Sequence, residues 1–374
     1  PRVLQEVELR AERLVRDYRN PETGRVGSGV FLLRGGPAKL AQPTMQEFAR
    51  LLVIGAARIG PARVAELVGG WVDDEPLRTR KCALIEGIGV KEDLTLPEHG
   101  VRLSRMPLSK GDLPGSFPEG SDLSLRRLRR GVLLSVDHEA RPALYRPNDI
   151  ANTNAHWNLR TQVPAGHDLQ GYTLDGFCQH LALATNNYVG WNLQWEDLGE
   201  LGAFSLSGGR GFGYGPDFGA RGTGITGPQL EDAVWTWRSM GGLEEGSQRK
   251  FGIALNRWVQ SKRQGMLENR IIDLRVTLEA LYAVERYGKR RQTADHSALH
   301  LGGTPDEQAA RKELIWRLYE EASEIVHAGV LDDEKEADAR LGQAQDVCRG
   351  SLLKVLNDGG FPDWRGSATR GSGR

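Results

Sequence analysis

Cysteine is scarce in this chain. The 374 residues include three cysteines, Cys82, Cys178 and Cys348, and none of them belongs to a Cys-x-x-Cys pair. An odd number of widely separated cysteines is typical of reduced thiols and argues against a disulfide framework. Because structural zinc sites are usually built on such pairs, we predict no metal, and the sequence indicates no cofactor.

Long apolar runs and an excess charge of one sign are also missing. No apolar stretch reaches the ~18–20 residues that cross a bilayer, and no signal-like segment opens the given sequence. We therefore expect a cytoplasmic protein without a membrane partner. The 49 basic and 49 acidic residues cancel to a formal net charge of zero. The whole chain thus has no general attraction to nucleic acid, although a local basic groove is not excluded.

The sequence divides into segments of different character. A hydrophobic content of 39% and a charged content of 26% allow sizeable cores. Residues 1–205 alternate short apolar runs with turn residues, which predicts a mixed α/β domain with a sensing or recruiting role. Residues 206–227 are dense in glycine and predict a linker or mobile loop. Residues 228–362 predict a helical bundle and 363–374 a disordered tail. The expected fold class is α+β.

Apolar spacing and capping signals give the expected elements. The pattern predicts a helix over 43–59 and another that starts at Pro61. It indicates strands over 131–136 and 188–195 and a helix over 174–184. In the last third we predict helices over 230–240, 247–262, 267–286, 304–327 and 333–357.

One histidine pair lies between these predicted helices. His296 and His300 have the spacing of two metal ligands on a helix. The glycines at 302 and 303 favour a loop instead, and no acidic ligand follows at a useful distance. We therefore predict a loop there and no metal site.

Two of the predicted helices carry a family resemblance. Residues 314–329 form an amphipathic segment that ends on His327 and, two residues later, a glycine; residues 267–282 accompany it. Together they resemble the HEPN helical domain, in particular the ApeA-like branch of bacterial defence proteins. The resemblance implies a homodimer formed through the bundle, with RNA as partner. It also implies a metal-independent endoribonuclease of antiviral or toxin-type defence with an Arg-x(4–6)-His motif.

The resemblance assigns roles to five residues of one helix. His327 would be the acid and base, because a histidine can both accept and donate a proton near neutral pH, and the carbonyl groups at a helix C-terminus favour its protonated form. Ala322 occupies the position where the family's ribonucleases carry the arginine that stabilises the phosphate. Tyr319, Ser323 and Glu324 would be nearby supports.

The alanine at position 322 leaves three alternatives. The chain could be a HEPN protein that binds RNA without cutting it, or another basic residue of the dimer could supply the cation. The given sequence could also carry an arginine-to-alanine replacement that silences a nuclease. The runner-up function is a non-catalytic HEPN module that binds RNA or a nucleotide, or scaffolds a partner. On its own, His327 is equally consistent with a histidine at a helix end that has no chemical role.

Five further residues complete the predicted site. Glu279 and Asp273 lie on the second family segment and could orient basic groups, or could be ordinary surface acids. Lys289, Arg290 and Arg291 form a basic run between the two family helices. They could hold an RNA backbone, or could belong to a solvated loop.

Overall fold

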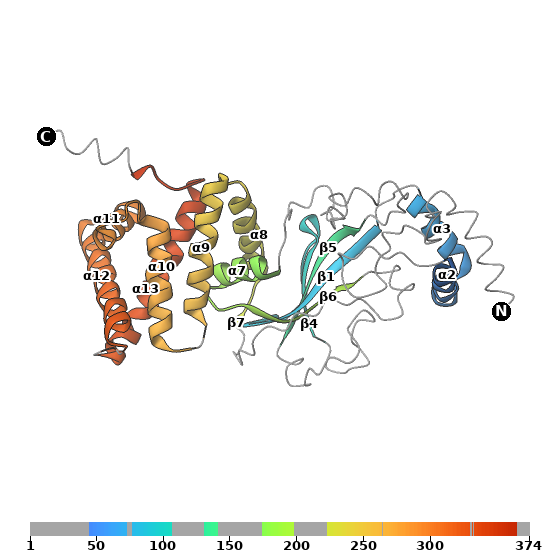
Figure 1. The fold of residues 1–374 in the computed structure, drawn as a ribbon, viewed down its shortest axis with the longest axis horizontal. Coiled ribbons are helices and arrows are strands. Elements are labelled where there is room, and N and C mark those ends of the chain that lie inside the picture. The colour runs from blue at the N-terminus through green and yellow to red at the C-terminus, as the bar shows by residue number, and fades with distance from the viewer. Residues whose placement is uncertain are drawn as a thin grey trace. The chain divides into compact units, whose positions relative to one another are not determined.

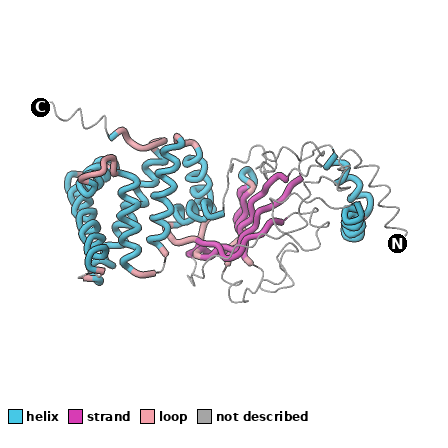
Figure 2. The backbone as a smooth tube through the Cα atoms, in the orientation of Figure 1, coloured by secondary structure: helices cyan, strands magenta, loops and turns pink. Residues whose placement is uncertain are grey.

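The computed structural model describes residues 45–72, 77–106, 131–140, 174–197, 223–263, 265–329, 331 and 333–364. The chain divides into two compact units, the first formed by Pro1–Ile85, Gly89–Gly171 and Trp191–Asp217 and the second by Glu86–Ile88, Tyr172–Gly190 and Phe218–Arg374. A sheet is the main described element of the first unit, and helices dominate the second (Figure 1, Figure 2). The α+β class expected from the sequence is confirmed.

Two helices of the first unit are separated by one glycine. They are α2 (Met45–Ile59) and α3 (Pro61–Val72), as the sequence pattern predicts. Gly60 has a φ of +89°, a conformation that glycine adopts without steric penalty. The proline that follows costs no helix hydrogen bond at the first position of α3. The apolar side chains that line these helices are buried: Leu51, Leu52, Val64, Leu67 and Val68.

The first unit also contains a five-stranded sheet. Its strands are β1 (Leu77–Glu86), β3 (Leu94–Leu96), β4 (Val101–Arg105), β5 (Val132–Ala140) and β6 (Gly190–Asp197). They lie in the order β3-β4-β5-β1-β6. β1 is antiparallel to β5, β5 to β4, and β4 to β3. The strands predicted over 131–136 and 188–195 are thus confirmed as β5 and β6.

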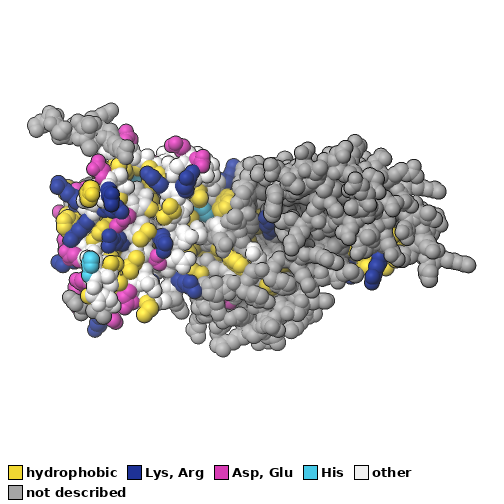
Figure 3. All heavy atoms as spheres, in the orientation of Figure 1, with side chains coloured by type: hydrophobic (Ala, Val, Ile, Leu, Met, Phe, Trp, Pro, Cys, Tyr) yellow, Lys and Arg dark blue, Asp and Glu magenta, His cyan; other side chains and the backbone are white. Residues whose placement is uncertain are grey.

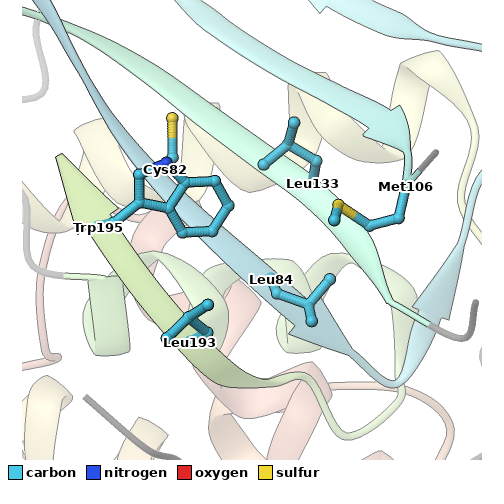
Figure 4. Close-up of a cluster of buried hydrophobic side chains, with 6 residues drawn as sticks. All are labelled: Cys82, Leu84, Met106, Leu133, Leu193 and Trp195. Carbon is cyan, nitrogen blue, oxygen red and sulfur yellow. The ribbon is translucent and has the colours of Figure 1, made fainter. Parts of the chain in front are cut away.

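Alternate residues of neighbouring strands pack into one apolar cluster. Cys82 and Leu84 project from the same side of β1 because strand side chains alternate, and Leu84 lies opposite Leu133 of β5. Burial raises the pKa of the Cys82 thiol to about 12, so this thiol stays protonated and unreactive. All three cysteines are free and buried. Figure 4 shows the complete cluster, which consists of Cys82, Leu84, Met106, Leu133, Leu193 and Trp195.

A glycine at the end of β1 allows a close backbone approach. Gly87 has a φ of +92°, and a Cβ atom at this position would lie 1.9 Å from the carbonyl oxygen of Tyr188. The Gly87 carbonyl accepts hydrogen bonds from the Asn187 side-chain amide at 2.6 Å and from the Thr223 backbone amide at 3.2 Å. Thr223 opens the short strand β7 (Thr223–Gly224), which pairs with β2 (Ile88–Gly89). Only glycine fits this junction without strain.

The second unit is a helical bundle. Its helices are α7 (Leu174–Thr185), α8 (Gly227–Gly241), α9 (Glu245–Lys262), α10 (Leu267–Tyr282), α11 (Lys289–Leu301), α12 (Pro305–Ala328) and α13 (Glu334–Asn357). α10 packs against α9, α11, α12 and α13. The turn between α9 and α10, the end of α12 and the start of α13 lie at one end of the bundle (Figure 1).

Local signals set the limits of α12. Thr304 and Glu307 form a capping box: each side chain accepts a hydrogen bond from the other residue's backbone N–H, at 3.3 and 2.7 Å. Pro305 occupies the first helical position. Gly329 closes the helix with a φ of +75° and donates its N–H to the Ile325 carbonyl. The sequence predicted both ends of this helix within two residues.

The segment 289–301 corrects a sequence prediction. It is helix α11 and not a loop. Its buried side carries His300 and four small side chains, two of them polar: Thr293, Ala294, Ser297 and Ala298. Such a face has no spacing of large apolar residues by which a helix is recognised in a sequence. Its small side chains allow neighbouring helices to approach closely.

The unit boundary also differs from the predicted 1–205 domain. Contacts group α7 with the helical unit. Arg349 of α13 donates from Nε to the Leu183 carbonyl at 2.8 Å, and Phe177 packs edge-on against Trp237 of α8. The predicted linker 206–227 lies outside the described residues except for 223–227, which form β7 and lead into α8. The predicted tail 363–374 lies outside them after residue 364.

Candidate functional site

Helix α12 has two distinct faces. Side chains on one face form part of the bundle core, and those on the other are exposed or half-buried. The spacing of three and four residues that produces each face is that of an α-helix. The core face carries Ile315, Leu318, Tyr319, Ala322 and Ile325; the outer face carries Trp316, Glu320, Ser323, Glu324 and His327.

His327 and Ala322 point in different directions. Ala322 has none of its surface exposed, whereas His327 is exposed near the end of the helix. Five residues along an α-helix rotate by about 500°, so the two side chains are about 140° apart around the axis. Within one chain, position 322 therefore faces the core and does not share the surface on which His327 stands.

The three predicted supports are divided between these faces. Ser323 is exposed one turn before His327, and Glu324 is half-buried beside it. Tyr319 is buried: its hydroxyl lies 3.0 Å from the Thr293 hydroxyl, and the guanidinium of Arg275 lies 5.0 Å from its ring centre. Tyr319 thus joins α12 to α10 and α11 and is not on the His327 surface.

Glu279 stands between two cations. Its carboxylate accepts hydrogen bonds from Arg275 Nε at 2.9 Å and from Lys289 Nζ at 2.8 Å. Burial alone would raise the pKa of Glu279, but these two hydrogen bonds outweigh it and leave the pKa below its usual value. Glu279 is therefore ionised and holds Lys289, one of the three predicted RNA-binding residues.

Arg290 links the basic run to the outer face of α12. Its guanidinium bonds Glu320 at 2.5 Å and lies 3.8 Å from the centre of the Trp316 ring. The hydrogen bond from Arg290 is the main reason that the pKa of Glu320 is lowered. Trp316 is 39% exposed, so an aromatic ring stacked with a cation faces solvent on the helix that carries His327.

The three basic residues do not form one positive patch. Lys289 pairs with Glu279, Arg290 with Glu320, and Arg291 with Asp295 at 3.5 Å. Basic and acidic side chains alternate over the visible face of the helical unit (Figure 3). Phosphate groups would have to compete with these carboxylates, which weakens the run as an RNA site.

Asp273 belongs to a different place, the end of the bundle where α9 and α10 meet. It bonds Arg257 at 3.0 Å, and burial raises its pKa although the hydrogen bond from Arg257 opposes the shift. Both residues line a groove of about 620 Å³. The groove's other polar side chains are Gln260, Arg263, Asn269 and Arg270. None of these four residues was singled out by the sequence analysis. The signal that could have found them is the recurrence of arginine at positions 257, 263 and 270, near the adjoining ends of α9 and α10.

The pair His296 and His300 has structural contacts. His300 lies between the Tyr282 hydroxyl at 3.1 Å and the Asp358 carboxylate at 3.0 Å. Burial lowers the pKa of His300, although Asp358 opposes the shift. His296 stacks on Trp364 with 4.4 Å between ring centres. In the described part of the chain, no cluster of His, Cys, Asp and Glu side chains could hold a metal ion.

We compared the chain with known proteins. No family model, no curated protein and no solved structure matches this chain. The HEPN resemblance therefore stays a prediction based on residues 267–282 and 314–329. Across the described ranges, none of the helices has the length and apolar character to cross a membrane.

The outer face of α12 sets the chemistry available to this site. An exposed imidazole, a hydroxyl and a carboxylate can accept and donate protons. RNA cleavage through the 2′-hydroxyl also needs a positive group at the phosphate. Among the described residues, no salt bridge or hydrogen bond connects a cation to His327. The face therefore has groups that can transfer protons, but RNA cleavage there would also need a cation beside His327.

Proposed function

We propose that this chain is a HEPN-like protein of bacterial antiviral or toxin-type defence that acts in the cytoplasm. With alanine at position 322, it binds RNA without cutting it. The observation that carries this proposal is the placement of α12. His327 stands on an exposed edge with Ser323, while position 322 lies in the core and holds no charge. Position 322 therefore offers no cation to stabilise the pentavalent phosphate of the cleavage reaction.

The outer face supports RNA as the ligand class. The guanidinium of Arg290 lies over the Trp316 ring, which is still 39% exposed, so a base can stack on the exposed part of the ring beside a cation. Glu320 competes for Arg290, so binding through this face should be weak and sensitive to salt. The family resemblance implies that a second copy pairs through the bundle, which would double the number of such faces.

A binding experiment tests the proposal. A fluorescently labelled single-stranded RNA is titrated with the whole chain at low salt, and its anisotropy and its length are followed together. We expect binding with no shortening of the RNA. The test variant is Trp316→Ala, which should weaken RNA binding because it removes the stacking surface. The matched control is Trp235→Ala, at an equally exposed tryptophan of α8. No binding, or equal loss in both variants, would contradict the proposal.

The second candidate is a silenced endoribonuclease. It is favoured by the exposure of His327 at the helix end, where a reacting RNA can reach it. The test compares the given chain with Ala322→Arg, each with and without His327→Ala. Cleavage that requires both the new arginine and His327 would establish the nuclease. If folded Ala322→Arg binds RNA and leaves it intact, the binding function stands and the nuclease is excluded.

A further inference from the structure

The groove at the α9–α10 end of the helical unit concentrates positive charge. Three arginines line it: Arg257 in α9, Arg263 directly after α9, and Arg270 in the first turns of α10. Asp273 supplies one carboxylate and bonds Arg257. Among the described residues that line the groove, three are therefore cationic and one is anionic.

Backbone groups add to the positive character. α10 starts at Leu267; its N-cap residue, Met266, makes no side-chain capping hydrogen bond, and Glu268 is the acidic residue of its first turn. The first N–H groups of a helix have no partner within the helix and carry the positive end of its dipole. Gly265 and Met266 both line the groove, so this helix end opens into it. A helix N-terminus beside three guanidinium groups is a combination that favours a phosphate group.

The groove also has an apolar side. Met266 is 69% exposed, and Ile272 lines the same space. A volume of about 620 Å³ is in the range of small-molecule sites and exceeds what one phosphate group fills. Gln260 and Asn269 provide amides that can bond a sugar or a base. The lining thus combines charge for a phosphate with a surface for an organic group.

We propose that this groove binds a phosphate ester. Its phosphate group is held by Arg263 and Arg270 at the start of α10, and its organic part rests against Met266 and Ile272. The ester could be a free nucleotide or one nucleotide of an RNA strand, since both present the same chemistry. The site is separate from the outer face of α12, and the proposal does not depend on RNA binding there.

Arg270 is already oriented for this role. Its Nε donates to the Ser261 carbonyl at 2.9 Å, which fixes the side chain across the α9–α10 turn. Its Nη1 is 3.9 Å from Asp338 of α13, a distance that leaves the guanidinium edge weakly engaged. A cation oriented before the ligand arrives loses less entropy on binding.

Calorimetric titration of the whole chain tests the proposal with three probes: pyrophosphate, ADP and an RNA octamer. Pyrophosphate tests whether the groove binds a phosphate group at all. ADP and the RNA octamer then show whether the phosphate ester is a free nucleotide or part of an RNA strand. Adenosine, which lacks phosphate, should not bind. Arg263→Gln should weaken pyrophosphate binding about tenfold or more, because it removes charged hydrogen bonds. Arg249→Gln is the matched control, since Arg249 is 74% exposed near the other end of α9.

A second variant should act in the opposite direction. Asp273→Asn removes the carboxylate that competes for Arg257 and keeps the side chain's shape, so pyrophosphate should bind several-fold more tightly. Absence of pyrophosphate binding would overturn the proposal, as would equal loss in Arg263→Gln and Arg249→Gln or weaker binding by Asp273→Asn. The proposed RNA binding by the outer face of α12 is tested separately, by the RNA anisotropy of Trp316→Ala. A groove that does not bind pyrophosphate would therefore not contradict the proposed function.

Discussion

An arginine at position 322 tests how the core and the proposed function are connected. Ala322 is completely buried between Tyr319 and Ile325 on the core face of α12. The substitution Ala322→Arg would place a long charged side chain there. If position 322 is an ordinary core position, the helical unit should lose much of its stability.

The magnitude follows from three contributions. Additional volume in a packed core costs about 1–3 kcal/mol. Ordering an arginine side chain costs up to about 2 kcal/mol. A buried charge without a partner costs several kcal/mol, although the long side chain can reduce this cost by extending toward solvent. We expect a loss of about 3–5 kcal/mol, a large part of the 5–15 kcal/mol that is typical of folded domains. Glu321, the adjacent acid, already pairs with Arg340.

The assay is chemical denaturation followed by circular dichroism. The control is Ala310→Arg, the same substitution at an exposed position of the same helix, which should change the stability by no more than about 0.5 kcal/mol. If Ala322→Arg is as stable as Ala310→Arg, the reasoning from burial is wrong. The arginine would then have a place prepared for it, as a silenced ribonuclease requires.

Three other predictions concern stability. Burial lowers the pKa of His180 to about 3. Between about pH 3 and 6.5, the unfolded chain therefore binds one more proton than the folded chain. As the pH decreases through this range, the free energy of unfolding should fall by about 1.4 kcal/mol per pH unit. His180→Phe should remove this slope in denaturation curves measured across that range, and an unchanged slope would contradict the assignment. Arg340→Met leaves the buried carboxylate of Glu321 without its partner and should lower the free energy of unfolding by about 3 kcal/mol. The control is Arg317→Met, in a pair that is mostly exposed, which should cost under about 0.5 kcal/mol. Equal costs in the two variants would refute the importance of burial for the Glu321 pair. Gly87→Ala should cost at least about 2 kcal/mol because of its positive φ and the neighbouring carbonyl oxygen, and a neutral result in urea denaturation would show that the junction can open.

The sequence alone determined features that depend on near neighbours. The ends of α12 follow from Thr304, Glu307 and Gly329, because capping is decided within one turn of helix. The apolar spacing of α9, α10 and α13 and the short run of β5 were likewise sufficient to predict helix or strand. These signals also gave the α+β class, since a helical last third and a strand-containing first part are visible in the pattern.

Only the tertiary structure decided what each polar residue contacts. α11 buries mainly small side chains, and the apolar spacing of the sequence does not reveal a buried face of this kind. Lys289, Arg290 and Arg291 form one basic run in the sequence, but carboxylates on α10, α12 and α11 separate them. The arginine groove likewise arises from the packing of the ends of two helices. Charge pairing depends on distances across the fold, and the sequence does not contain those distances.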